Sequence, residues 1–85
     1  MNETIIVIFV NPFGLKTKCE IPIFAKDESE FTVLAEDEAT SWFYDVANED
    51  FSIYWRERGG TDAEYDMYFE NYLDLSRVEW EVKID

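Results

Sequence analysis

The chain has 85 residues, with 20 Asp or Glu, seven Lys or Arg and no His, for a formal net charge of -13. This length predicts a single domain with a modest core, and a hydrophobic content of 47% predicts a folded protein rather than a disordered acidic tail. The charge excludes nucleic acid and anionic membrane surfaces as direct ligands, because both are bound through Lys and Arg.

Cysteine content and hydropathy indicate where the protein is located. Cys19 is the only Cys, so no internal disulfide can form, and a reducing compartment is the simpler interpretation. The apolar run 5–10 is too short to span a membrane, and Glu3 stands where a signal peptide would carry basic residues. We therefore expect a cytoplasmic protein.

The first two predicted elements are strands that form a hairpin. Residues 4–10 are a continuous, largely β-branched run, which is typical of a strand buried on both faces. Residues 11–14 (N-P-F-G) predict a turn. Residues 17–24 alternate in part, and Pro22 within them indicates an edge strand or a bulge, because Pro cannot donate a ladder hydrogen bond.

A short strand and a helix are predicted next. Residues 31–35 (F-T-V-L-A) have strand composition, and the acidic triplet 36–38 would complement the positive end of a helix that starts there. Apolar residues then recur at the i, i+3, i+4, i+7, i+8 spacing of an amphipathic helix. These residues are Ala39, Trp42, Phe43, Val46 and Ala47. Asn48 would cap the C-terminus of this helix.

Residues 51–58 (F-S-I-Y-W-R-E-R) fit two structures. The alternation of Phe51, Ile53 and Trp55 favours a strand, whereas the basic residues before Gly59 and Gly60 favour the last turn of a helix. The strand is slightly preferred.

A helix over residues 62–74, capped by Thr61 or Asp62, and a final strand over residues 77–84 complete the chain. The final strand is clear, because Val78, Trp80 and Val82 alternate with charged residues. The fold class is therefore α+β, with a mostly antiparallel sheet of four to five strands and two helices on one face.

The sequence lacks the residues of familiar catalytic and metal sites. Without His, Ser-His and Cys-His nucleophiles are absent, and one Cys cannot form a thiolate metal site. The three glycines form no phosphate loop. Residues 27–38 have the length of a calcium loop, but Thr32 occupies the position that requires glycine. We therefore expect no enzymatic activity, no cofactor and no dedicated metal site.

Acidic residues recur every fourth position in the helix predicted over residues 62–74. Like charges four residues apart on a helix cost a few tenths of a kcal/mol per pair, so this row works against helix stability and predicts contact with a basic partner. We call Asp62, Asp66, Glu70 and Asp74 the acid row. The second predicted acidic cluster consists of Glu36, Asp37, Glu38, Glu49 and Asp50. Tyr44 and Tyr54 lie off the apolar stripes and are candidate interface residues.

Charge is segregated along the chain. No basic residue lies between Lys26 and Arg56 or between Arg58 and Arg77, although these two segments contain fourteen acids. One interpretation is a solvated surface that keeps a small protein monomeric. The other is a mimic of nucleic-acid phosphates, because the acid row repeats on the length scale of a phosphate backbone.

In its size, charge, lack of His and aromatic richness, the chain resembles the small acidic inhibitors encoded by phages and mobile elements. This class includes DNA-mimic anti-restriction proteins, uracil-DNA glycosylase inhibitor and anti-CRISPR proteins. The resemblance assigns no residue roles. It implies a stoichiometric inhibitor, acting in a host bacterium, that occupies the basic groove of a CRISPR effector, restriction enzyme or repair enzyme. Two alternatives stay open. One is an immunity protein or antitoxin for a basic toxin nuclease. The other is an acidic interaction domain of cellular origin that serves as an adaptor or as a dimerisation module, for which the sheet edge near Pro22 is a candidate contact.

Overall fold

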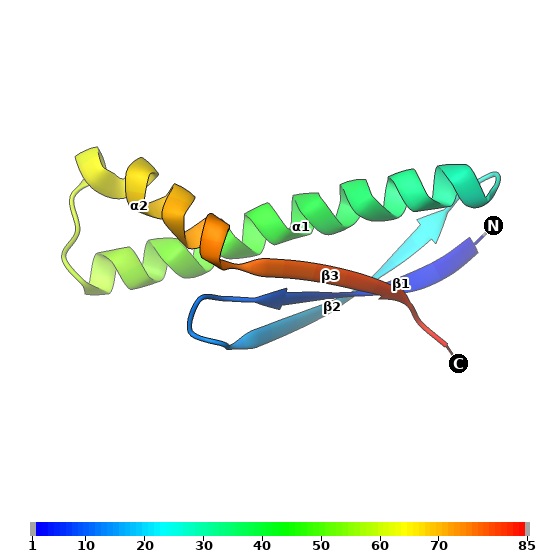
Figure 1. The fold of residues 1–85 in the computed structure, drawn as a ribbon, viewed down its shortest axis with the longest axis horizontal. Coiled ribbons are helices and arrows are strands. Elements are labelled where there is room, and N and C mark those ends of the chain that lie inside the picture. The colour runs from blue at the N-terminus through cyan, green and yellow to red at the C-terminus, as the bar shows by residue number, and fades with distance from the viewer. Residues whose placement is uncertain (1, 85) are drawn as a thin grey trace.

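The computed structural model describes residues 2–84 and shows an α+β fold (Figure 1). The elements in chain order are β1 (Asn2–Val10), β2 (Lys16–Phe24), α1 (Glu28–Glu57), α2 (Asp62–Leu75) and β3 (Arg77–Val82). The strands form one antiparallel sheet in the order β2-β1-β3. The predicted hairpin, the helix over residues 62–74 and the final strand are confirmed. The predicted count of four to five strands is wrong, because the described residues contain three.

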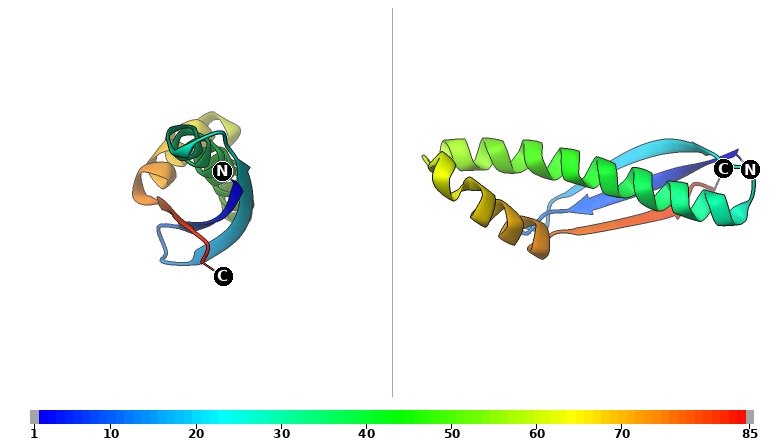
Figure 2. Two further views of the ribbon diagram at one scale, coloured as in Figure 1. Left: turned by 90° about the vertical axis from the view of Figure 1, so that its right-hand side faces the viewer. Right: turned by 90° about the horizontal axis from the view of Figure 1, so that it is seen from above.

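The central strand β1 supplies the middle of the core. Ile5, Val7 and Phe9 are fully buried beneath α1, whereas the alternate residues Ile6, Ile8 and Val10 are only half-buried. The prediction that this strand is buried on both faces is therefore wrong. The helices all lie on one side of the sheet, as Figure 2 shows, so the apolar residues on the other face of β1 are left uncovered.

The hairpin turn and the sheet edge follow the predicted chemistry. The Asn11 side-chain oxygen accepts hydrogen bonds of 2.9 Å from the backbone N–H groups of Phe13 and Leu15. Gly14 has φ +84°, a conformation that glycine adopts without a steric penalty. Strand β2 pairs with β1 alone among the described residues, so Pro22 lies on an edge strand as predicted.

Helix α1 is a single helix of 30 residues, about 45 Å long at 1.5 Å per residue. It begins after Asp27, whose side chain accepts a 2.8 Å hydrogen bond from the Glu30 backbone N–H, as an N-cap does. The strand predicted over residues 31–35 is therefore wrong, because this segment forms the first turns of α1. Residues 36–38 and Asn48 lie inside the helix and neither start nor end it.

A row of buried residues explains why the helix runs so far. Its members are Phe31, Ala35, Ala39, Phe43, Ala47, Phe51 and Trp55. A step of four residues turns about 400°, so the row drifts by about 40° per step and winds around the helix. The first three members pack on the sheet, and the last four pack in a second cluster with Phe9 and Tyr72. One helix can therefore cover the sheet at its start and face α2 at its end.

The end of α1 is a glycine stop. Gly59 has φ +74°, its N–H bonds to the Arg56 carbonyl, and the Gly60 N–H bonds to the Trp55 carbonyl, both at 3.0 Å. These are the two hydrogen bonds of a Schellman motif. The strand preferred over residues 51–58 is wrong. Phe51 and Trp55 are buried as i, i+4 helix neighbours, while Ile53, the middle of the apparent alternation, is 45% exposed.

Helix α2 turns back along the end of α1 and packs on Phe51. Five ring centroids lie 5.1 to 6.0 Å from that of Phe51. They belong to Tyr54, Trp55, Tyr65, Phe69 and Tyr72. Of the two caps predicted from the sequence, Thr61 and Asp62, the N-cap of α2 is Thr61. Its side chain makes no capping hydrogen bond.

The buried row makes a prediction about packing. Ala39 is 2% exposed between α1 and the sheet, so Ala39→Leu should lower the free energy of unfolding by about 1–3 kcal/mol through overpacking. Ser41→Leu adds the same side chain at an exposed position on the same helix and should change it by less than about 0.5 kcal/mol. Urea denaturation checks both, and equal effects would contradict the assigned face.

Candidate functional site: an acidic helical surface beside an aromatic groove

The acid row lies on the surface of α2. Asp62, Asp66, Glu70 and Asp74 are all exposed, and successive members rise about 6 Å along the helix axis. None of the four forms an ion pair with another described residue. The ion pair found within residues 2–84 joins Lys83 Nζ to Glu20 Oε1 at 3.0 Å, on the sheet. The row therefore retains its mutual repulsion in the free protein.

The basic residues nearest to α2 in the sequence do not neutralise the row. The Arg58 guanidinium donates a 2.8 Å hydrogen bond to the Tyr54 hydroxyl, and its central carbon lies 5.8 Å from the centroid of the same ring. Arg77 begins β3 and takes part in no ion pair within the described residues. Neither arginine is engaged with the row.

The second predicted cluster is divided by the structure. Glu36, Asp37, Glu38 and Glu49 are exposed on α1. Asp37 and Glu49 lie opposite the buried row, but twelve residues, or about 18 Å, separate them along the axis. Asp50 lies on the flank of the helix and is half-buried. These residues therefore form an acidic strip along α1 rather than one compact patch.

Asp50 differs from the other acids in its surroundings. Burial, with a smaller contribution from the adjacent charge of Glu49, raises the pKa of its carboxyl group. Burial also raises the pKa of the Tyr72 hydroxyl, with a further contribution from Asp50, whereas the Asn11 side chain acts in the opposite direction. Asp50 therefore carries its negative charge at a cost to the folded state.

The two candidate interface tyrosines have different environments. Tyr44 is 51% exposed and packs edge-on against Phe43, with centroids 5.6 Å apart. Tyr54 is half-buried between Phe13 at 5.6 Å and Phe51 at 6.0 Å. Tyr44 thus lies free on the acidic surface, and Tyr54 belongs to an aromatic cluster at the end of α1.

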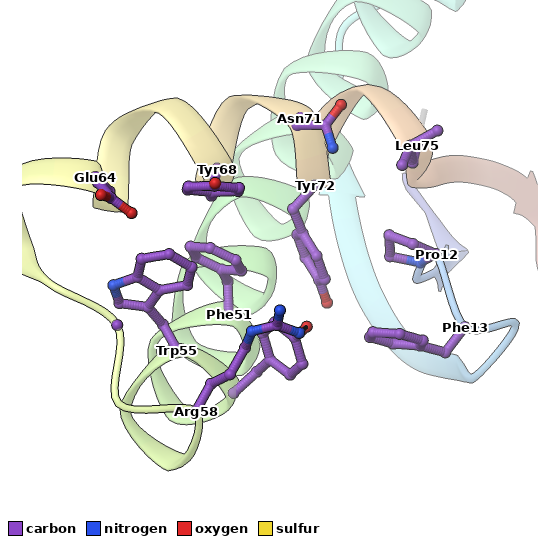
Figure 3. Close-up of a pocket in the computed structure, with 12 residues that line it drawn as sticks. Pro12, Phe13, Phe51, Trp55, Arg58, Glu64, Tyr68, Asn71, Tyr72 and Leu75 are labelled. Atoms are coloured by element: carbon purple, nitrogen blue, oxygen red, sulfur yellow. Dashed lines mark hydrogen bonds between the residues drawn. The ribbon is translucent and has the colours of Figure 1, made fainter.

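That cluster lines a groove of about 490 Å³ between the hairpin turn, the end of α1 and α2 (Figure 3). The lining residues are Pro12, Phe13, Phe51, Tyr54, Trp55, Arg58, Gly60, Glu64, Tyr68, Asn71, Tyr72 and Leu75. Phe13 and Leu75 are 65% and 62% exposed at its rim. The Trp55 indole N–H donates a 2.9 Å hydrogen bond to the Thr61 carbonyl. A side chain at Gly60 would overlap the Trp55 ring, so glycine is required there.

This groove is not predicted from the sequence, although the sequence contains a signal for it. Phe13 is a large apolar residue in a predicted turn, where it has no core position to fill. Leu75 lies about one turn beyond Tyr72 at the end of α2, and both line the groove. The exposure of Phe13 and Leu75, at 65% and 62%, marks an apolar rim, and an apolar rim of this kind is typical of an interaction surface.

Comparison with known proteins adds no family: no family model, no curated protein and no solved structure matches the chain. No helix of the described residues is long and apolar enough to cross a membrane. The acid row, the acidic strip on α1 and the groove are therefore the features from which a function can be inferred.

The raised pKa of Asp50 makes a prediction about pH. A carboxyl whose pKa is higher in the folded state adds stability below its unfolded pKa, near 3.8, and that stability is lost as pH rises through the folded pKa. Asp50→Asn should therefore raise the melting temperature at pH 7, and its advantage should shrink below about pH 4.

Asp45→Asn is the matched control, because it removes the same charge from an exposed position on α1. Thermal denaturation followed by circular dichroism between pH 3 and pH 8 compares the two variants. An equal gain from both at pH 7 would show that general charge repulsion, and not burial of Asp50, is responsible.

Proposed function

We propose that the protein is an acidic stoichiometric inhibitor that occupies a basic nucleic-acid-binding groove of a DNA- or RNA-acting protein, in the manner of DNA-mimic anti-restriction and anti-CRISPR proteins. One observation carries the proposal: the acid row is exposed on one helix and unpaired with any described residue. A row of like charges costs helix stability. A groove lined with Lys and Arg would reverse that cost on binding, and both surfaces would release counter-ions.

The dimensions of α2 support phosphate mimicry. The row advances about 6 Å per carboxylate along the helix axis, while one strand of duplex DNA carries a phosphate every 3.4 Å or so of rise. Side chains of Lys and Arg spaced for alternate phosphates would therefore reach successive members of the row. The exposed acids of α1 enlarge the negative field and would raise the association rate at low salt.

The aromatic groove supplies the short-range contacts that a charge field lacks. Tyr68 lines the groove and is two residues from both Asp66 and Glu70, which places it on the other side of α2 from the row. A cleft that encloses α2 would therefore meet carboxylates on one wall and aromatic rings on the other. Aromatic side chains in such positions commonly dominate binding energy.

A displacement assay tests the proposed function. A fluorescently labelled DNA duplex is bound by purified enzymes of different folds: a guide-loaded CRISPR effector, a restriction enzyme and a uracil-DNA glycosylase. The protein should release the duplex from at least one of them at 50 mM NaCl, and less effectively at 300 mM NaCl because salt screens the attraction. Release from none at 50 mM NaCl would overturn the proposal. Inhibition of a single toxin nuclease added to the panel would favour an immunity protein.

The acid row makes a prediction within this assay. Asp66→Lys combined with Glu70→Lys should weaken inhibition about tenfold or more at 50 mM NaCl and flatten its salt dependence, because two attractions become repulsions. Glu3→Lys combined with Glu28→Lys is the matched control. It changes the net charge equally at the far end of the molecule, where β1 and α1 begin (Figure 1). Equal weakening by the two pairs would refute the role of α2 and leave only the net charge.

A further inference from the structure

The outer face of the sheet lies opposite α1 and differs from the acidic surface of the helices, because it combines apolar residues with charges of both signs. Figures 1 and 2 show both helices on the other side of the sheet. Ile6, Ile8 and Val10 of the central strand form an apolar column along this face, and each is half-buried. Such a column on an open sheet is a surface that a partner can cover.

Charged residues flank the apolar column in an ordered way. Residues opposite each other in an antiparallel pair share a face, so the strand registers define three cross-strand rows. Lys16, Val10 and Arg77 form a basic row. Lys18, Ile8 and Glu79 form a mixed row. Glu20, Ile6 and Glu81 form a row that we call the glutamate row. Across these three rows, charge therefore runs from positive to negative about the centre at Ile8. Beyond the negative end, Lys83 follows β3 and forms an ion pair with Glu20.

We propose that this face binds a second copy of the chain, sheet against sheet, around a two-fold axis that lies between the two sheets at the level of Ile8 and runs across the strands. This axis reverses the strand direction, so the basic row of one copy lies over the glutamate row of the other. Arg77 then faces Glu81 of the second copy, and Lys16 faces Glu20, which is also paired with Lys83 of its own chain. The two apolar columns pack between them. Lys18 and Glu79 meet their own equivalents at the rim, where water weakens the repulsion.

The charge distribution favours a second copy on this face over any other. The net charge of this face is +1, although that of the whole chain is -13. The face carries four basic residues, Lys16, Lys18, Arg77 and Lys83, and three acidic residues, Glu20, Glu79 and Glu81. Helices α1 and α2 carry most of the exposed acids, and in the proposed dimer they point away from each other. A contact through the helices would instead bring two acidic surfaces together.

The size of the face sets the strength of the dimer. Strand β1 has nine residues, so the sheet is about 30 Å long. It is three strands wide, with about 4.8 Å between neighbouring strands. This footprint is smaller than that of stable specific interfaces and falls in the range of weak, transient ones. We expect a reversible dimer with a dissociation constant in the micromolar range, seen by sedimentation equilibrium of the whole chain between about 5 µM and 1 mM in 100 mM NaCl.

A charge swap tests the register of the dimer. Arg77→Glu and Glu81→Arg should each weaken dimerisation by about tenfold, and the double variant should restore it. Arg77 and Glu81 lie four residues apart on one strand, or about 13 Å, so they do not touch within a copy. Recovery in the double variant therefore reports contact between copies.

Further variants make the test decisive. Ile8→Lys should abolish the dimer by placing two charges at the axis, and Glu28→Lys, at the start of α1, should leave it unchanged. Circular dichroism checks that each variant is folded. If Ile8→Lys does not fold, the charge swap alone decides the test. A chain that stays monomeric up to 1 mM would overturn the proposal. So would a dimer that both single reversals leave intact, since its contact would then lie elsewhere, for example at the β2 edge near Pro22.

Discussion

The fold depends on the row of buried residues that recurs every fourth position along α1. An ideal helix does not keep a four-residue repeat on one side, so the row winds through roughly two-thirds of a turn from Phe31 to Trp55. The sheet receives the first part of the row, and α2 receives the last part. Small residues at Ala35, Ala39 and Ala47 allow close approach, while Phe43 and Phe51 fill the volume at the junction.

This arrangement also decides where charge can lie. A single long helix that buries one winding row leaves the opposite row exposed along its whole length, and that row carries Asp37, Asp45 and Glu49. The second helix packs only on the end of the first, so most of its own circumference remains in water. The helical layer can therefore carry most of the acids without burying them. Glu30 and Asp50 are the half-buried acids of α1, and burial raises the pKa of Asp50.

The sequence predicts the sheet better than it predicts the long helix. The hairpin and the last strand have local signals: β-branched runs, a turn with Asn and Gly, and strict alternation over residues 77–82. The segments 31–35 and 51–58 have strand composition, yet both are helical, because they extend the packing of the central helix in both directions. The four-residue repeat from Phe31 to Trp55 was the available signal, and it becomes visible only when the two segments are considered together with residues 39–47.

The candidate site divides in the same way between local and tertiary information. The exposure of Asp62, Asp66, Glu70 and Asp74 follows from helix geometry alone, so the sequence is enough to place them on one surface. The groove between Phe13, Tyr54 and Tyr68 requires the hairpin turn to meet the end of α1 and the side of α2, and no local pattern specifies that meeting. The split of the second acidic cluster has a similar cause, because it depends on one uninterrupted helix between Glu36 and Asp50.

A domain of this size has a small free energy of unfolding. Repulsion within the acid row on α2 and within the acidic strip on α1 makes it smaller still. Repulsion within the helical layer is tolerable because Phe51 and the five rings around it concentrate apolar burial at the point where α2 joins α1. A chain that needed charge only for solubility would gain from placing Lys or Arg between its acids. Keeping most of the acids on the helices, and four of the seven basic residues on the outer face of the sheet, separates the molecule into two chemically different faces. Two faces of this kind can hold two partners at once, a basic groove on the helices and a second copy on the sheet, because neither contact covers the other.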